Sequence, residues 1–206
     1  IFGGTEAFAA NSNFEYLVNA GSTATPGGLG YGNLSITGSG ATALGWGSSI
    51  SEVQGNLTIL GTGSGATRHA LLGSGSLTLN IGGDFIISGG NFWLSSGTGN
   101  CTINLAGNLL INGGTLDLAN SSGVGTINVG GNVTVSSGTL TEGGSTTTSK
   151  IVFNKSGNQT FTSGGTISIN VVGNGPFTYT LVKPDSSTEV FTTNLTTQNY
   201  NDLDSG

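Results

Sequence analysis

Carboxylates are the first side chains to consider, because enzymes that cleave polysaccharides work with pairs of them at a defined separation. Ten acidic residues are spread over the 206 positions, together with four basic residues and one histidine. Asp84 stands where Asn108 and Asn132 stand 24 and 48 residues later, which predicts a turn residue rather than a catalytic acid. Asp117 has no second carboxylate at equivalent positions, so paired acid–base chemistry is not expected.

Histidine, cysteine and metal chemistry also find little support. Arg68 and His69 fall in an inserted segment, residues 61–75, which we expect to be a solvated loop. Cys101 is the single cysteine, which excludes an internal disulfide and a cysteine-based metal cluster. Calcium-binding nonapeptide repeats carry an Asp in every turn, whereas the turns here carry Gly and Asn. We therefore expect no catalytic residue, no metal site and no cofactor, and predict that the protein is not an enzyme.

The composition excludes further classes of protein. Four basic against ten acidic residues cannot form the positive surface that reads nucleic-acid phosphates. No apolar run approaches the roughly 20 residues of a membrane-spanning helix, so membrane insertion is not expected. The 39 glycines and the 7% of charged residues resemble a disordered chain, but the 34% of hydrophobic residues recur with a regular period. The period favours a folded protein.

Scarce Lys and Arg, abundant Thr and Asn, and the single Cys indicate a secreted or cell-surface protein. Because the chain does not begin with Met, we expect a processed or excised piece of a longer polypeptide.

One pentapeptide supplies this period: Gly, Asn or Asp, an apolar residue, any residue, and a β-branched residue. It occupies residues 32–36, 55–59, 83–87, 107–111 and 131–135, and the intervals between its glycines are 23, 28, 24 and 24. Two further apolar tracks keep the same step, one beginning at residues 79, 103, 127 and 151 and the other at residues 92, 116 and 140. Short alternating segments separated by Gly-rich corners indicate strands.

Three short strands per 24 residues, repeated in register, predict an all-β parallel β-solenoid, in which each period is one coil. Gly at the corners supplies the positive φ that sharp bends need. Alternation then points the first and third residue of each segment inward. The predicted inner stacks are Leu79, Ile103, Ile127 and Ile151; Phe85, Leu109 and Val133; and Phe92, Leu116 and Leu140.

The outward residues form rows with their own predicted roles. We expect structural ladders of Asn80, Asn104 and Asn128 and of Thr78, Thr102 and Thr126, in which amides and hydroxyls bond from coil to coil. Ile86 and Leu110 are predicted to point outward on adjacent coils near Trp93. Because an exposed apolar patch can mark a contact surface, these three residues are the candidate contact site, unless flanking loops or a neighbouring molecule cover them.

The sequence divides into three regions. Residues 1–30 carry no clean repeat and are expected to be an N-terminal cap or linker, because an exposed solenoid end would template edge pairing. Residues 31–169 form the predicted solenoid. In residues 170–206 glycine becomes rarer, and strands over residues 177–182 and 190–193 indicate the start of a small or incomplete β-sandwich-like module.

Residues 55–59, 113–118 and 151–161 resemble the β-helical regions of large surface and secreted proteins of the Bacteroidota, many of which use the type IX secretion route. Residues 173–180 and 194–200 are similar to the opening of the immunoglobulin-like repeats of gliding-motility adhesins. The resemblance implies an extracellular or cell-surface stalk, fibre subunit or adhesin segment. It carries over no catalytic residue.

Three functions of different classes remain open. The leading one is a non-enzymatic structural or adhesive segment, whose partners would be copies of itself, other surface proteins or glycans. The second is a β-helix that binds or processes carbohydrate, although Trp46 and Trp93 lie two coils apart. The third is an ice-binding solenoid with flat rows of Thr, although Ile86 and Leu110 interrupt one such row.

Overall fold

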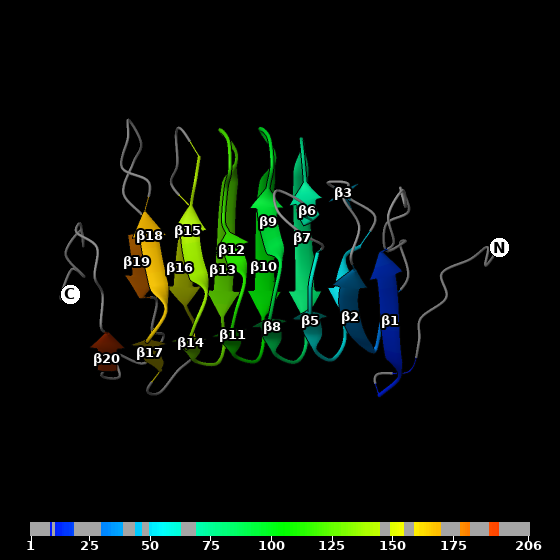
Figure 1. Ribbon diagram of the computed structural model, residues 1–206, viewed down its shortest axis with the longest axis horizontal. Helices are drawn as coiled ribbons and strands as arrows, with labels where there is room; N and C mark the ends of the chain where they lie inside the picture. The colour runs from blue at the N-terminus through cyan, green and yellow to red at the C-terminus, as the bar shows by residue number, and fades with distance from the viewer. Residues whose placement is uncertain are drawn as a thin grey trace.

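The computed structural model describes residues 9, 11–18, 30–38, 44–46, 50–62, 69–144, 149–154, 159–169, 178–181 and 190–193. These residues form strands and turns without a helix, and every described strand pairing is parallel. The strands build three sheets that wrap around one core, as Figure 1 shows. The chain is therefore a parallel β-solenoid of about five turns, roughly 24 residues apart, which confirms the predicted fold.

Each sheet is one face of the solenoid. The long face contains β1 (Asn13–Val18), β2 (Asn33–Gly38), β5 (Leu57–Ile59), β8 (Phe85–Ile87), β11 (Leu109–Ile111), β14 (Val133–Val135), β17 (Thr160–Ser163) and β20 (Val190–Thr193). The third face contains β3 (Leu44–Gly45), β6 (His69–Leu72), β9 (Asn91–Ser95), β12 (Thr115–Asp117), β15 (Thr139–Glu142) and β18 (Thr166–Ile169). The ladder face contains β4 (Glu52–Val53), β7 (Ser76–Ile81), β10 (Asn100–Leu105), β13 (Val124–Val129), β16 (Lys150–Phe153) and β19 (Thr178–Leu181).

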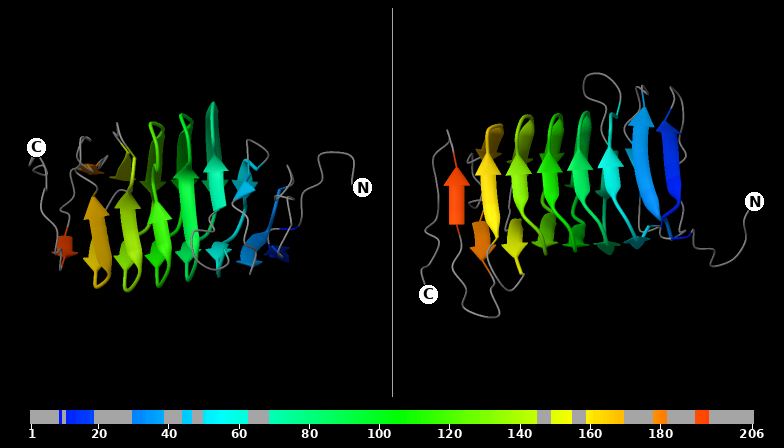
Figure 2. Two further views of the ribbon diagram at one scale, coloured as in Figure 1. Left: turned by 45° about the horizontal axis from the view of Figure 1, so that its top comes forward. Right: turned by 90° about the horizontal axis from the view of Figure 1, so that it is seen from below.

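The chain visits the three faces in a fixed order, so that β8, β9 and β10 make one coil and β11, β12 and β13 the next. Figure 2 shows the long face in its right-hand view, with β1 and β20 at opposite ends of the stack. Equivalent residues lie directly beside one another; Ile103, for example, is in register with Leu79 and Ile127. All three predicted inner stacks are buried in one continuous apolar core.

The glycines at the corners act in two different ways. Gly90, Gly114 and Gly138 have φ values of 72°, 66° and 84°, and they turn the chain from the long face to the third face. The pentapeptide glycines instead sit where the corner of one coil touches the corner of the coil before it. A Cβ on Gly107 would lie 2.4 Å from the carbonyl oxygen of Gly83, so no larger residue fits. The predicted need for positive φ therefore holds at one corner, and close approach explains the other.

Two segments differ from the expectation for the solenoid. His69 is not part of a solvated loop: it begins β6, whose backbone pairs with β3 and β9, and Leu71 and Leu72 join the core. The additional residues of the 28-residue interval precede this strand, and Arg68 lies outside the described residues. The prediction failed because the alternation of β6 does not resemble that of β9 in the next coil.

The terminal strands add to the same sheets. β1 pairs parallel with β2, so part of the expected N-terminal cap is one more strand of the long face. The two strands expected after residue 170 are present, but β19 pairs parallel with β16 and β20 with β17, rather than with each other as in a sandwich. The remainder of the predicted sandwich-like module lies outside the described residues.

Candidate functional site

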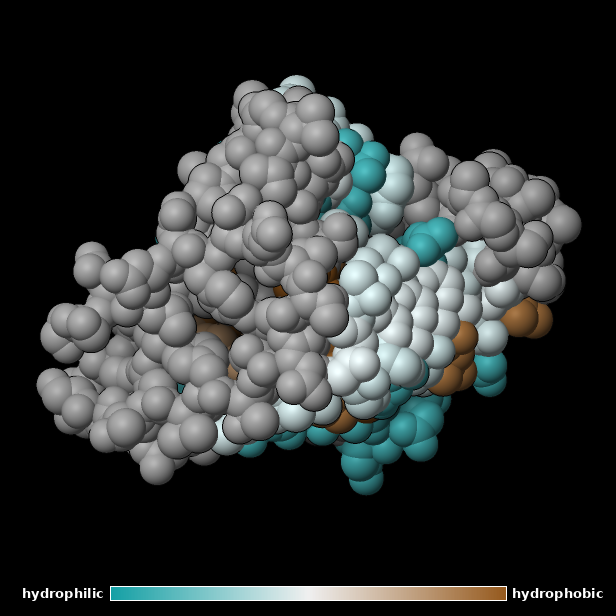
Figure 3. Space-filling model, turned by 60° about the vertical axis from the view of Figure 1, so that its left-hand side comes forward, coloured by the Kyte–Doolittle hydropathy of each residue, from teal (hydrophilic) through white to brown (hydrophobic). Residues whose placement is uncertain are grey.

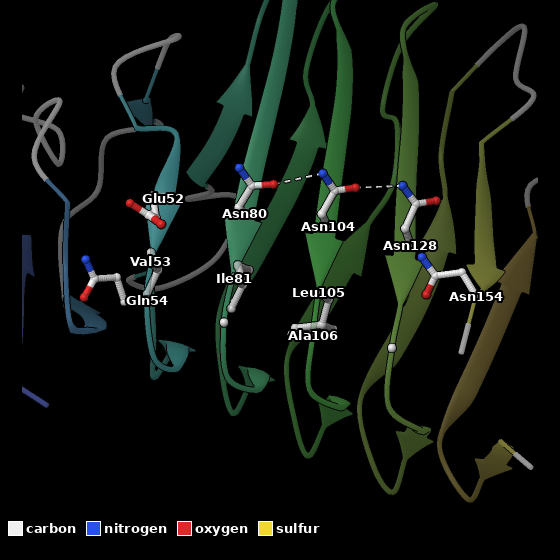
Figure 4. A pocket seen from close by; sticks show the side chains of 12 residues that line it. Glu52, Val53, Gln54, Asn80, Ile81, Asn104, Leu105, Ala106, Asn128 and Asn154 are labelled. Atoms are coloured by element: carbon white, nitrogen blue, oxygen red, sulfur yellow. Dashed lines mark hydrogen bonds between the residues drawn. The ribbon is translucent and has the colours of Figure 1, made fainter. Parts of the chain in front are cut away.

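A groove of about 510 Å³ runs across the strands of the ladder face, close to the corner that leads to the long face. Its lining comes from β4, β7, β10 and β13 and from Asn154, which directly follows β16. Figure 4 shows the amide side chains of successive coils side by side along it. The groove therefore extends along the axis on which the coils are stacked.

Two neighbouring rows of outward residues shape this groove. One row carries Glu52, Asn80, Asn104 and Asn128, one residue per coil. The other row lies two residues further along each coil and contains Gln54, Gly82, Ala106, Gly130 and Asn154. Its three central members are small and its two end members are large, so the row is hollow in the middle and closed at both ends.

Backbone hydrogen bonds hold the small row in place. The amides of Ala106 and Gly130 donate to the carbonyls of Ile81 and Leu105 at 2.9 and 2.7 Å. A Cβ on Gly82 would lie 2.1 Å from the carbonyl oxygen of Gln54, which requires glycine there. Ala106 nevertheless carries a Cβ and is exposed, so this row accepts a side chain in the middle of the groove.

The predicted asparagine ladder forms one wall of the groove. Asn104 Nδ2 donates to Asn80 Oδ1 at 2.9 Å, and Asn128 Nδ2 donates to Asn104 Oδ1 at 2.8 Å (Figure 4). All three side chains lie on the surface, with Asn80 and Asn104 fully exposed. The bonds confirm the prediction that the amides link successive coils.

A second ladder, which we call the corner ladder, lies at the corner beside the groove. Asn33, Asn56, Asp84, Asn108 and Asn132 each accept, through side-chain Oδ1, the backbone N–H of the equivalent residue in the next coil; the distances are 2.7, 2.7, 2.7, 2.9 and 2.9 Å. Asp84 thus occupies a structural corner position, as the sequence predicted. The recurring Asn of the pentapeptide was visible in the sequence, but we had attributed it to the turn conformation rather than to a bond between coils.

Acid–base chemistry has no pair of carboxylates at the groove, where Glu52 is the single charged lining residue. Asp117 is in register with Trp93 and Thr141, as expected, but it is buried rather than outward-facing. Its carboxylate accepts hydrogen bonds from the backbone of Ala119 and Gly143 and from the Asn120 amide. Burial raises the pKa of Asp117, and these hydrogen bonds oppose the rise.

Glu142 is a second buried acid that sequence reasoning missed. It occupies the inward position that Leu118 fills in the coil before, and it accepts a hydrogen bond from the backbone of Ser149 at 3.2 Å. Within the described ranges, no three His, Cys, Asp or Glu side chains are grouped so that they could hold a metal ion. Both buried acids are held by backbone donors, which is a structural arrangement.

Cys101 is buried at the second position of β10, as predicted. Desolvation raises the pKa of its thiol to about 12, which leaves essentially no thiolate near neutral pH. Trp46 is also buried, with its ring centroid 5.3 Å from that of Phe92 in an edge-to-face contact. Neither side chain reaches the groove.

The predicted contact surface is only partly assembled. Ile86 and Leu110 are in register on the long face, and both are half-buried. Trp93 belongs to β9 on the third face, because the chain turns at Gly90, so the three side chains do not share one face. Leu17 and Leu60 are the large apolar residues that are most exposed in the described ranges. In the view of Figure 3 the described surface is mostly of intermediate hydropathy, with small separate apolar patches.

Thr78, Thr102 and Thr126 lie in register on the ladder face, as predicted. Their row continues through Lys150, which places a charged residue beside Thr126. Hydroxyl bonding between these threonines, and the ice-binding hypothesis that rests on such rows, remain predictions.

The groove itself was missed by sequence reasoning, although its signal was present. Gly82, Ala106 and Gly130 recur at the 24-residue step, two residues after the asparagines. Elsewhere in the part of the chain that the structure covers, no helix has the length and apolarity needed to cross a lipid bilayer. The chain matches no family model, no curated protein and no solved structure.

Proposed function

We propose that this chain is a non-enzymatic structural segment of an extracellular or cell-surface protein, acting as a stalk, spacer or fibre subunit. The observation that carries this proposal is the unbroken register of the three sheets, in which each coil stacks on the last at about 4.8 Å. A solenoid of this kind grows in one dimension, because every coil contacts only its neighbours. It therefore separates whatever lies at its two ends.

Three features support rigidity in such a segment. The core is continuous from Tyr31 to Ile167, so the stack has no apolar gap at which it could hinge. The asparagine ladder ties the coils together at the ladder face, and the corner ladder does so at the adjacent corner. Extended rods of this sort suit proteins that hold a binding module away from a cell.

Electron microscopy of the full-length parent polypeptide tests this proposal. We expect rods or filaments whose length increases with the number of 24-residue coils. Compact, monodisperse globules would contradict it. Small-angle scattering of the chain itself provides a second measurement, for which we expect the asymmetric distance distribution of an elongated particle.

A further inference from the structure

The groove on the ladder face has the shape of a binding site for a linear molecule. Its lining residues come from five successive coils, between Glu52 and Asn154. Four spacings of about 4.8 Å give a length of about 19 Å along the stacking axis. A compact ligand would occupy only part of that length, whereas an extended chain would contact one coil after another.

The lining is chemically uniform along this length. Five side chains of the groove are amides, and they belong to Gln54, Asn80, Asn104, Asn128 and Asn154. Amides offer both donors and acceptors, which is what hydroxyl groups require. Glu52 at one end is the single ionisable lining residue, and no lining residue is cationic. With a net charge of −6, the protein disfavours a polyanion at this surface.

The ladder leaves hydrogen-bonding capacity for a ligand. An Asn side chain has two N–H donors and two acceptor lone pairs. Asn104 uses one donor toward Asn80 and one acceptor toward Asn128. One N–H and one lone pair of Asn104 remain, and the ladder bonds fix the plane of the amide that carries them. A fixed amide loses little conformational entropy when a ligand binds.

We propose that this groove binds a linear, neutral polysaccharide chain lying along the stacking axis. A hexose unit of an extended glycan is about as long as one strand spacing, about 4.8 Å, so successive sugars meet equivalent amides on successive coils. Ala106 and the adjacent glycines leave room for the rings, while Gln54 and Asn154 bound the site. The site binds and does not cleave, since it contains no pair of carboxylates. This inference does not depend on the proposed rod function.

The test is isothermal titration calorimetry of the whole chain against linear neutral glucan, mannan, xylan and galactan oligosaccharides long enough to span four coils. An oligogalacturonate of equal length serves as the anionic comparison. Ala106→Gln fills the groove with a residue that the same row already carries at Gln54. Asn104→Leu removes one amide from the wall. Thr134→Val, on the long face, is the matched control outside the groove.

We expect at least one neutral oligosaccharide to bind, and Ala106→Gln and Asn104→Leu each to weaken it by about tenfold. Thr134→Val should bind as the wild type does. Circular dichroism melts identify any variant that is unfolded; Ala106→Gln keeps the test valid if Asn104→Leu does not fold, because Ala106 is exposed. The proposal is overturned if no neutral chain binds, if oligogalacturonate binds as tightly, or if both groove variants bind like the wild type.

Discussion

Single residues show most clearly how burial, rather than residue type, sets chemical behaviour in this solenoid. Asp117 and Glu142 are acids inside a wall of apolar and polar stacks, and each is held by backbone N–H groups. Cys101 is shielded to the point that its pKa rises to about 12. The residues with the greatest intrinsic reactivity are therefore those least able to react, which agrees with a structural role.

The inside–outside assignment is tested at two adjacent residues of β10. Leu105 is buried, so Leu105→Asp places an unpaired carboxylate in the core and should destabilise the protein by several kcal/mol, about 3 or more. Asn104 is exposed, and Asn104→Asp should change stability by less than about 1 kcal/mol. Thermal melts followed by circular dichroism measure both. A larger loss for Asn104→Asp would reverse the assignment.

Asp117 predicts a specific dependence of stability on pH. Because burial raises its pKa in the folded state, the folded protein binds this proton more tightly than the unfolded chain does. The contribution of Asp117 to stability is therefore fully present below its unfolded pKa of about 4 and falls as the pH rises through the higher folded value.

Asp117→Asn removes this titration while keeping the acceptor for Ala119 and Gly143, at the loss of the acceptor for Asn120. We expect the difference in melting temperature between variant and wild type to shift in favour of the variant between pH 3 and pH 7. Asp84→Asn, at a position where other coils carry Asn, controls for the removal of a carboxylate. A difference that is constant with pH would refute the argument.

At the scale of the element, the corners determine whether one coil can stack on the next. Strands of three residues, such as β8 and β11, bury only two side chains each and could not be stable alone. Their stability comes from neighbouring coils, and the corners fix the distance between those neighbours. Close contact of glycines and side-chain bonding by asparagines act at the same corner.

The contact of glycines is tested by Gly107→Ala. Its new Cβ would lie 2.4 Å from Gly83 O and 2.5 Å from Asp84 Oδ1, so the corner must move, at a cost of about 1–3 kcal/mol. Gly73→Ala is the matched control, because the nearest atom to its Cβ would be Ser96 Oγ at 3.9 Å. Denaturant unfolding of both variants provides the comparison, and equal stabilities would argue against the contact.

The bonding of asparagines is tested by Asn108→Ala. This change removes the acceptor for the Asn132 amide and the donor to Asp84, and it should destabilise the protein by about 1–3 kcal/mol. Asn100→Ala removes an exposed asparagine of β10 that is outside both ladders, with an expected change within about 0.5 kcal/mol. If the two variants unfolded at the same denaturant concentration, the corner ladder would contribute nothing to stability.

At the scale of the whole molecule, the 24-residue period was enough to predict the solenoid, the three faces and the inner stacks. It succeeded because register in a stack repeats every inward residue, as Leu79, Ile103 and Ile127 do. It failed for β6, where the period is broken, and for Asp117, since alternation along a strand does not report what the following corner covers. The groove escaped notice because the absence of a side chain, as at Gly82, has no pattern of hydrophobicity.

The corner ladder also has a direction, because each coil accepts from the coil that follows it in the chain. A coil that has folded presents side-chain acceptors to residues that emerge later from a ribosome or a secretion pore. The next coil is thus templated on a finished surface, and order can advance from the first coils to the last in 24-residue steps. Such vectorial folding would let each completed coil act as a ratchet against backsliding of a chain in transit.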